Sequence, residues 1–148
     1  METLNYRIKE LTKEILETSK GFYETLENLT YAPELPLESA KKILGIINNQ
    51  QGYIFVALKD NNEIIGTATI LIKNKFIHRG SKAAHIEDVV TKKEYEGKGI
   101  GNELVKRCIE LAKEKRCYKL ILNCDKKNIS FYEELGFEKH GYEMRKNL

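Results

Sequence analysis

The stretch HIEDVVTKKEYEGKGIG, residues 85–101, decides the predicted fold. It opens as an apolar strand that carries two neighbouring acids, Glu87 and Asp88, and it closes with glycines at positions 97, 99 and 101. A strand followed by a glycine-rich turn and a helix presents unpaired N–H groups and the positive end of a helix dipole to an anion such as phosphate. A flexible turn would use the same glycines, so the spacing alone leaves both interpretations open.

The apolar pattern before this stretch predicts a short strand, two helices and a hairpin. Residues 6–8 form the strand, and apolar residues at helical spacing predict one amphipathic helix over residues 11–29. A second helix begins at Pro36 and ends in the polar run 48–52. The runs YIFVALK and EIIGTATILI flank the turn-forming residues 60–62 and predict the hairpin.

The pattern after the glycines predicts two more helices and two more strands. The first helix places five residues on its buried side: Leu104, Val105, Cys108, Leu111 and Ala112. Residues 117–124 form a strand, Asn128 caps a short helix through Leu135, and Gly136 suits its left-handed C-terminal position. The residues from Phe137 form a final strand. The predicted order is β-α-α-β-β-β-α-β-α-β, an α/β fold with a mixed sheet and helices on both faces.

Composition excludes several classes of protein. A chain of 148 residues without repeats or linkers fits one domain, 1–148. The charged fraction of 32% is mixed in sign and nets +3, unlike the basic surface of a nucleic-acid binder. We see neither a membrane span nor an apolar signal core, and the three cysteines lack disulfide or zinc spacing. We therefore expect a cytoplasmic protein with no metal, no nucleic-acid partner and no membrane partner.

The glycine spacing fits neither GxGxxG nor GxxxxGK[ST]. It resembles instead the [RQ]xxGxG segment with which the GNAT superfamily of N-acetyltransferases cradles the pyrophosphate of coenzyme A. This segment and five others are similar, in order and spacing, to the glucosamine-6-phosphate N-acetyltransferase family and span residues 73–144: KFIH, HIEDVV, YEGKGIGNEL, CYKLILNC, NISFYEELGF and GYEM. The resemblance implies acetyl transfer from acetyl-CoA to the amine of D-glucosamine 6-phosphate, a step towards UDP-N-acetylglucosamine. It also implies a homodimer whose active sites are shared between the chains.

The resemblance assigns residues to three sets. The catalytic set is Glu87, Asp88 and Tyr132. The acetyl-CoA set is Val89, Val90, Thr91, Gly97, Lys98, Gly99, Ile100, Gly101, Asn102, Asn128 and Tyr132. The sugar-phosphate set is Thr30, Lys75, Phe76, Ile77, His78, Glu87, Asp88, Val89, Tyr118, Lys119, Asn123 and Arg145.

Three positions depart from the family pattern. Glu96 stands where Arg or Gln is usual, and a solvated carboxylate near a pyrophosphate costs on the order of 1 kcal/mol. Lys92, Lys93 and Lys98 are close enough in sequence to offset that charge. Asn123 stands where the family commonly has Asp, and the change is harmless if the backbone carbonyl of this residue is the group that binds. Asn147 replaces a phosphate-binding Arg, so the cation would have to be Arg145 or Lys146.

Acyl transfer to an amine needs a neutral nitrogen, a donor for the developing oxyanion and help for the leaving thiolate. We expect Glu87, directly or through water, to be the base; the alternative is an ion-paired carboxylate in the sheet. A phenol has a pKa of about 10 and a thiol about 8.5, so Tyr132 would stabilise the thiolate by hydrogen bonding. The alternative is that Tyr132 completes a packed helix face with Phe131 and Leu135.

The two acids lie on opposite faces of an ideal strand, Glu87 with Val89 and Asp88 with Val90. Both can serve one ligand only if a β-bulge interrupts the strand between them. Such a bulge would also free the N–H of Val89 to bind the acetyl oxygen.

Other functions and roles stay open on the residues alone. The chain would also suit an acetyltransferase of another small amine or of a protein N-terminus, or a coenzyme A-binding regulatory module without turnover. We expect His78 to reach a phosphate, His85 to be structural and Cys124 to pack in the core.

Overall fold

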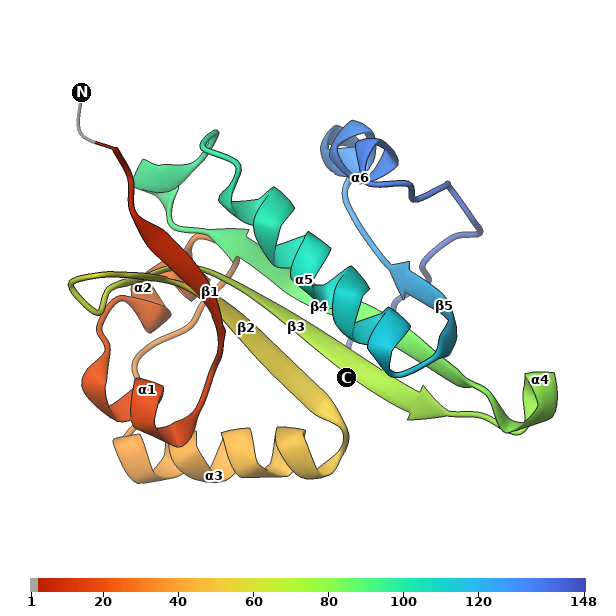
Figure 1. The fold of residues 1–148 in the computed structure, drawn as a ribbon, viewed down its shortest axis with the longest axis horizontal. Helices are drawn as coiled ribbons and strands as arrows, with labels where there is room; N and C mark the ends of the chain where they lie inside the picture. Colours follow the sequence, from red (N-terminus) through yellow and green to blue (C-terminus); the bar gives the residue numbers. More distant parts are fainter. Residues whose placement is uncertain (1–2) are drawn as a thin grey trace.

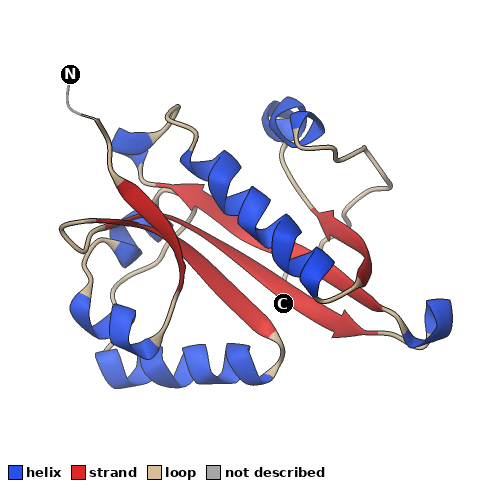
Figure 2. Cartoon of the chain, in the orientation of Figure 1, coloured by secondary structure: helices blue, strands red, loops and turns tan. Residues whose placement is uncertain are grey.

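The computed structural model describes residues 3–148, so the first two residues of the predicted domain 1–148 lie outside the described part. Five strands within this part form one sheet in sequence order (Figures 1 and 2). They are β1 (Tyr6–Glu10), β2 (Gly52–Lys59), β3 (Ile64–Asn74), β4 (Lys82–Thr91) and β5 (Cys117–Leu122). The first four are antiparallel, and β5 runs parallel to β4. The mixed sheet confirms the predicted fold class.

The helices of the described chain are α1 (Lys13–Thr18), α2 (Phe22–Glu27), α3 (Leu37–Asn49), α4 (Ile77–Gly80), α5 (Ile100–Glu114) and α6 (Ile129–Glu134). Of these, α1–α3 cover one face of the sheet and α5 covers the other. Along β2, Phe55 and Ala57 belong to the core beneath α5, whereas Ile54 and Val56 pack with α1 and α3 on the other side. This alternation follows from the two-residue repeat of a strand. Figure 1 shows α5 crossing β3 and β4, as their contacts require.

Several predicted elements are confirmed. The hairpin joins β2 to β3 through residues 60–62, and α3 follows Pro36. All five residues predicted on the buried side of α5 are buried. The predicted strand 117–124 ends two residues early, at Leu122, and Asn128 precedes α6 without forming a side-chain cap. No helix in residues 3–148 is both long enough and apolar enough to cross a membrane.

The predicted helix over residues 11–29 is wrong, because the structure has two helices there. Between them the backbone of Lys20 pairs with the hairpin: its N–H donates to the Asn62 carbonyl (3.0 Å), and its carbonyl accepts from Ile64 (2.8 Å). Gly21 then adopts φ +89°, and a Cβ at this position would lie 2.7 Å from the Ile64 carbonyl oxygen. The apolar spacing persists across the break, but these backbone groups bond to the sheet instead of continuing a helix.

The predicted final strand from Phe137 is also wrong for a single chain. Residues 137–148 form no strand, and the outer edge of β5 has no neighbouring strand within residues 3–148. Tyr142 and Met144 are 100% and 94% exposed. A strand needs a partner for its backbone groups, and in one copy of the chain the last segment does not pair with the open edge of β5.

Candidate active site

A β-bulge in β4 brings the two acids to one side of the sheet. Thr69 pairs with Glu87 but Thr67 pairs with Val90, so β4 holds one more residue than β3 across this interval. Within it, Asp88 has the left-handed value φ +54°. The side chains of β4 therefore do not alternate between the two faces after Glu87, as an ideal strand would require. The bulge that both acids need in order to face one ligand is present.

The acids line a pocket of about 250 Å³ on the face opposite α5. Its other walls come from α1–α3 and from strands β2 and β3, and they include Leu26, Leu44, Thr67 and Thr69. Most of the lining is Leu and Ile, while Glu87 and Asp88 themselves are exposed. The carboxylates are thus placed at the rim of an apolar hollow, where they can accept protons or hydrogen bonds from a ligand.

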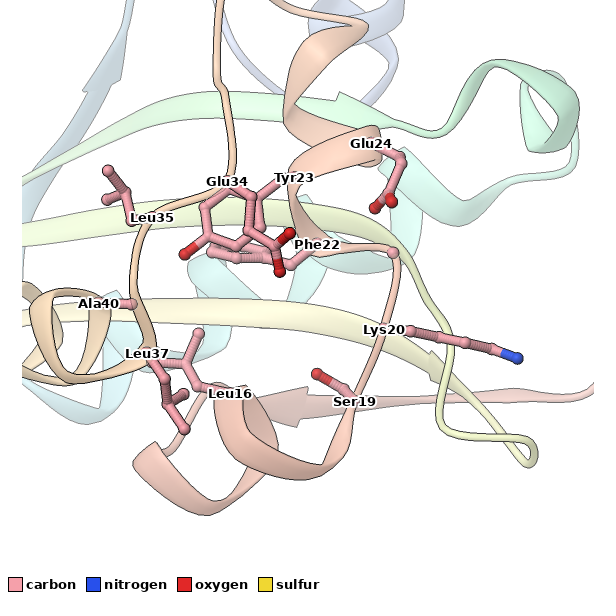
Figure 3. Close-up of a pocket in the computed structure, with 11 residues that line it drawn as sticks. Leu16, Ser19, Lys20, Phe22, Tyr23, Glu24, Glu34, Leu35, Leu37 and Ala40 are labelled. Carbon is pink, nitrogen blue, oxygen red and sulfur yellow. The ribbon is translucent and has the colours of Figure 1, made fainter.

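A neighbouring hollow of about 210 Å³ extends the pocket between α2 and the segment that leads into α3. The two hollows share Leu16, Phe22, Tyr23, Leu35 and Ala40. Figure 3 shows Phe22, Tyr23 and Glu34 gathered in it, with Lys20 directed away. Burial, and next the Glu34 charge, raise the pKa of Tyr23, so its hydroxyl is a hydrogen-bond donor at neutral pH.

The edge of β4 beside the acids is open. Pairing between β4 and β5 ends at Ile86 and Leu122, whereas β4 continues to Thr91. Figure 1 shows β5 and the chain that leads to α6 turning away from β4 beyond this point. The predicted coenzyme residues Val89, Val90 and Thr91 therefore line a gap between two diverging parallel strands.

The glycine turn lies at the far end of that gap. Gly97 and Gly99 have φ of +76° and +84°, values that strain any residue with a Cβ. The first bond of α5 runs from the Glu103 N–H to the Gly99 carbonyl (3.1 Å), so the N–H groups of residues 100–102 have no acceptor within the helix. A Cβ at Gly97 or Gly99 would meet nothing within 4 Å. The turn thus offers free donors and open space to an anion.

Tyr132 lies across the gap, on α6. Its ring packs edge-on against Phe131 at 4.9 Å and Phe137 at 5.8 Å between centroids. The pKa of Tyr132 is raised to about 12, mainly by burial and to a smaller extent by the charges of Cys124 and Cys108. The phenol therefore stays protonated. Phe131 and Leu135 pack on the core as predicted. Cys124 is exposed, so the prediction that it packs in the core is wrong.

The predicted sugar-phosphate residues fall into two groups. Thr30 follows α2, whose Leu26 lines the pocket with the two acids, but the stretch 75–78 lies beyond the other end of β4. There His78 stacks on Tyr118 at 4.1 Å, and the Lys119 amino group lies 5.5 Å from the same ring. Lys119 pairs with Ala83, four residues before Glu87, which corresponds to about 13 Å along the strand.

The remaining predicted residues are exposed. Asn123 and Asn128 follow β5 on the α6 side of the gap. Arg145 belongs to the C-terminal segment, where its Nε donates to the Asn147 side chain (2.8 Å). Within residues 3–148, no group of three or more His, Cys, Asp or Glu residues is arranged to hold a metal ion.

Two contacts at the site were not predicted. The Asn28 side-chain amide donates to the Thr91 carbonyl and to the Glu96 carboxylate, both at 2.7 Å. Lys92, expected to offset the Glu96 charge, instead pairs with Glu63 at 2.7 Å. Neither contact has a sequence signal, because Asn28 and Glu63 are distant from the loop along the chain.

Comparison with known proteins identifies the family. A model described as the acetyltransferase (GNAT) family matches residues 12–137. The glucosamine 6-phosphate N-acetyltransferase of Trypanosoma brucei brucei is 34% identical over 149 residues, covering 95% of this chain and 98% of that protein. The chain belongs to the glucosamine 6-phosphate N-acetyltransferases of the GNAT family. Glucosamine 6-phosphate N-acetyltransferase 1 of Dictyostelium discoideum is 31% identical to this GNAT chain. The match covers 88% of this chain and 85% of the Dictyostelium protein.

Solved structures of GNAT acetyltransferases share this fold. A Trypanosoma brucei acetyltransferase has a TM-score of 0.91 and 32% identity, over 97% of this chain and 100% of that one. Glucosamine-6-phosphate N-acetyltransferase from Arabidopsis thaliana has a TM-score of 0.90 and 29% identity, over 97% and 98% of the two chains. The GNAT prediction made from the glycine turn and its flanking motifs is confirmed.

Proposed function

We propose that this enzyme transfers the acetyl group of acetyl-CoA to the amine of D-glucosamine 6-phosphate, as the names of its relatives state for those proteins. The observation that carries the proposal is the bulge at Asp88, which places two carboxylates beside an open strand edge and the glycine turn. Acyl transfer is accelerated when the acceptor amine and the acyl donor are held next to each other, and these elements converge on one place.

Acetyl-CoA is the donor that GNAT acetyltransferases use, and the residues of this chain fit it. The free N–H groups at residues 100–102 and the helix dipole suit a pyrophosphate, with Lys98 beside them. The open edge at residues 89–91 can pair with the amide groups of the pantetheine arm. Asn128 and Tyr132 would bind from the α6 side.

The chemistry then divides among four groups. Bound acetyl-CoA supplies a thioester carbon that the amine attacks, with C–N bond formation and C–S bond cleavage. Glu87 accepts a proton from the amine, directly or through water, and Asp88 helps to orient the acceptor. The Val89 N–H donates to the acetyl oxygen, and the protonated Tyr132 hydroxyl donates to the departing sulfur.

We infer that the active form is a homodimer in which each site takes groups from both chains. The main chain at Lys119 lies about 13 Å along the sheet from Glu87, so a site in which Lys119 comes from a second chain fits this spacing. The outer edge of β5 lacks a strand partner in residues 3–148, and Phe76, Tyr142 and Met144 are almost fully exposed. An open edge and exposed apolar side chains are typical of an interface. The cytoplasmic location and the role in UDP-N-acetylglucosamine synthesis stay predictions.

The decisive experiment mixes the purified protein with acetyl-CoA and follows the release of free thiol. We expect release with glucosamine 6-phosphate and much slower release with unphosphorylated glucosamine. Equal rates with the two sugars would show that the enzyme does not recognise the 6-phosphate. No release with either sugar, despite acetyl-CoA binding, would favour another amine or a regulatory module.

A further inference from the structure

Asn28 joins two segments that the proposed reaction uses for different substrates. Its amide nitrogen lies 2.7 Å from the Thr91 carbonyl and 2.7 Å from a Glu96 carboxylate oxygen. A primary amide has two N–H hydrogens, so each acceptor can receive one. The side chain therefore connects the end of β4 to the residue that precedes the glycine turn.

On the coenzyme side, this contact helps to hold the loop between β4 and the turn. Glu96 is extended (φ −63°, ψ 151°), and the left-handed Gly97 follows it directly. The same loop is braced from the hairpin side by the Lys92–Glu63 ion pair (2.7 Å) and by the Lys59–Tyr95 hydrogen bond (2.9 Å). The Asn28 contact holds the loop from the α2 side, at the residue directly before Gly97.

On the acceptor side, Asn28 ends α2 and lies two residues before Thr30, a predicted sugar-phosphate residue. The N–H groups of Leu29 and Thr30 both donate to the Leu26 carbonyl, at 2.8 and 3.1 Å. Thr30 is thus attached to α2 through the backbone turn that contains Asn28. A shift of Asn28 would move this segment as well.

We propose that the Asn28–Glu96 hydrogen bond is a positioning contact that couples acceptor binding to coenzyme binding. The proposal rests on the function proposed above. It also accounts for Glu96, which replaces the family's Arg or Gln: its carboxylate is held by Asn28 on the α2 side of the turn. Coupling between two binding sites is reciprocal, so each ligand must raise the affinity of the other by the same factor.

The test measures binding in the absence of turnover. Free coenzyme A and glucosamine 6-phosphate cannot react with each other, so calorimetry can give the Kd of each ligand with and without the other. In the wild type, we expect each ligand to lower the Kd of the other by the same factor. Asn28→Ala and Glu96→Ala, which break the contact from opposite ends, should reduce this factor towards one. Glu96→Gln keeps an acceptor for Asn28 and should retain the factor.

Two controls match these variants. Glu94→Gln removes a charge from the same loop, and Asn49→Ala removes an exposed amide; neither side chain forms a hydrogen bond within the described chain. Both controls should retain the wild-type factor. Asn28→Ala should also weaken coenzyme A alone by about 3- to 10-fold, the effect of one hydrogen bond.

Several outcomes would overturn the proposal. The first is a wild-type protein in which neither ligand changes the Kd of the other. The second is an unchanged ratio of Kd values in both alanine variants, and the third is loss of that ratio in Glu96→Gln as well. If glucosamine 6-phosphate does not bind at all, the proposed function and the coupling fail together. The affinity of Asn28→Ala for coenzyme A then still decides separately whether Asn28 positions the turn, and an unchanged Kd would reject that role.

Discussion

At the scale of single residues, the chemistry depends on groups whose local environments differ sharply. Glu87 is exposed at the rim of a pocket, whereas Tyr132 is half-buried among aromatic rings. Burial keeps the phenol protonated, so it can donate a hydrogen bond, and exposure leaves the carboxylate free to accept one. The proposed base, Glu87, and the proposed donor, Tyr132, thus lie in different environments on the two sides of the gap.

Replacing Glu87 tests the base. Glu87→Gln keeps the size of the side chain but removes its basic oxygen, so we expect kcat to fall by about 100-fold or more. The Kd for acetyl-CoA, measured by calorimetry, should change by less than about 3-fold, the energy of one weak hydrogen bond. Losses of equal size in kcat and in acetyl-CoA affinity would show that Glu87 supports the coenzyme site instead.

Replacing Tyr132 tests the donor and its pKa. Tyr132→Phe keeps the packing against Phe131 and Phe137, so at pH 8 we expect lower kcat with little loss of stability. The folded pKa of about 12 exceeds the unfolded value of about 10. The stabilisation from the neutral phenol is therefore present below pH 10 and is lost as pH rises from 10 to 12. Urea unfolding in this range should show a steeper loss for the wild type than for Tyr132→Phe; parallel curves would contradict the raised pKa.

At the scale of elements, the site depends on two interruptions of regular structure. The bulge in β4 turns Asp88 to the side of Glu87, and the break at Gly21 divides the first helical region so that its second half, α2, can reach β4. Regular elements would have separated these groups. The irregular backbone therefore assembles the site, and the flanking strands hold it in place.

Asp88 allows the backbone role and the charge role to be measured separately. Asn tolerates φ near +54°, so Asp88→Asn should keep the unfolding free energy within about 0.5 kcal/mol. Any fall in its kcat then reports the lost charge. A β-branched residue is strained in this conformation, so Asp88→Val should lose about 1–3 kcal/mol of stability. Equal urea midpoints for the two variants would mean that the bulge does not depend on residue 88.

At the scale of the whole molecule, one chain holds the predicted site residues at opposite ends of a sheet. The acids and the glycine turn lie towards the C-terminal end of β4, while His78, Tyr118 and Lys119 lie towards its N-terminal end. The C-terminal segment, which the sequence predicts as a strand, lies unpaired in the single chain. A second copy can supply both the missing strand partner and the missing cations.

Mixing two inactive variants tests this sharing. Glu87→Gln and Lys119→Ala should each have low activity as pure homodimers. If each site takes Glu87 from one chain and Lys119 from the other, a mixed dimer contains one intact site. Co-expression should then restore about one quarter of wild-type activity, because half of randomly assembled dimers are mixed. No restoration, with dimers confirmed by light scattering, would assign both residues to the site of a single chain.

The sequence by itself determined the elements whose signals are local. Apolar periodicity located α3 and α5, turn residues located the hairpin, and the glycine spacing with its flanking motifs identified the family. These signals work because burial and backbone geometry act over a few neighbouring residues. Local signals therefore predict Glu87, Asp88 and the turn at 97–101 from one continuous stretch of sequence.

Only the tertiary structure decided the features that depend on distant partners. The break at Gly21 exists because Lys20 pairs with the hairpin, and the final strand fails because no neighbour within the chain pairs with it. The contact of Asn28 with Glu96 joins residues that are 68 positions apart. Each of these features is stabilised by contacts between two segments that are distant in sequence, so it cannot be predicted from either segment alone.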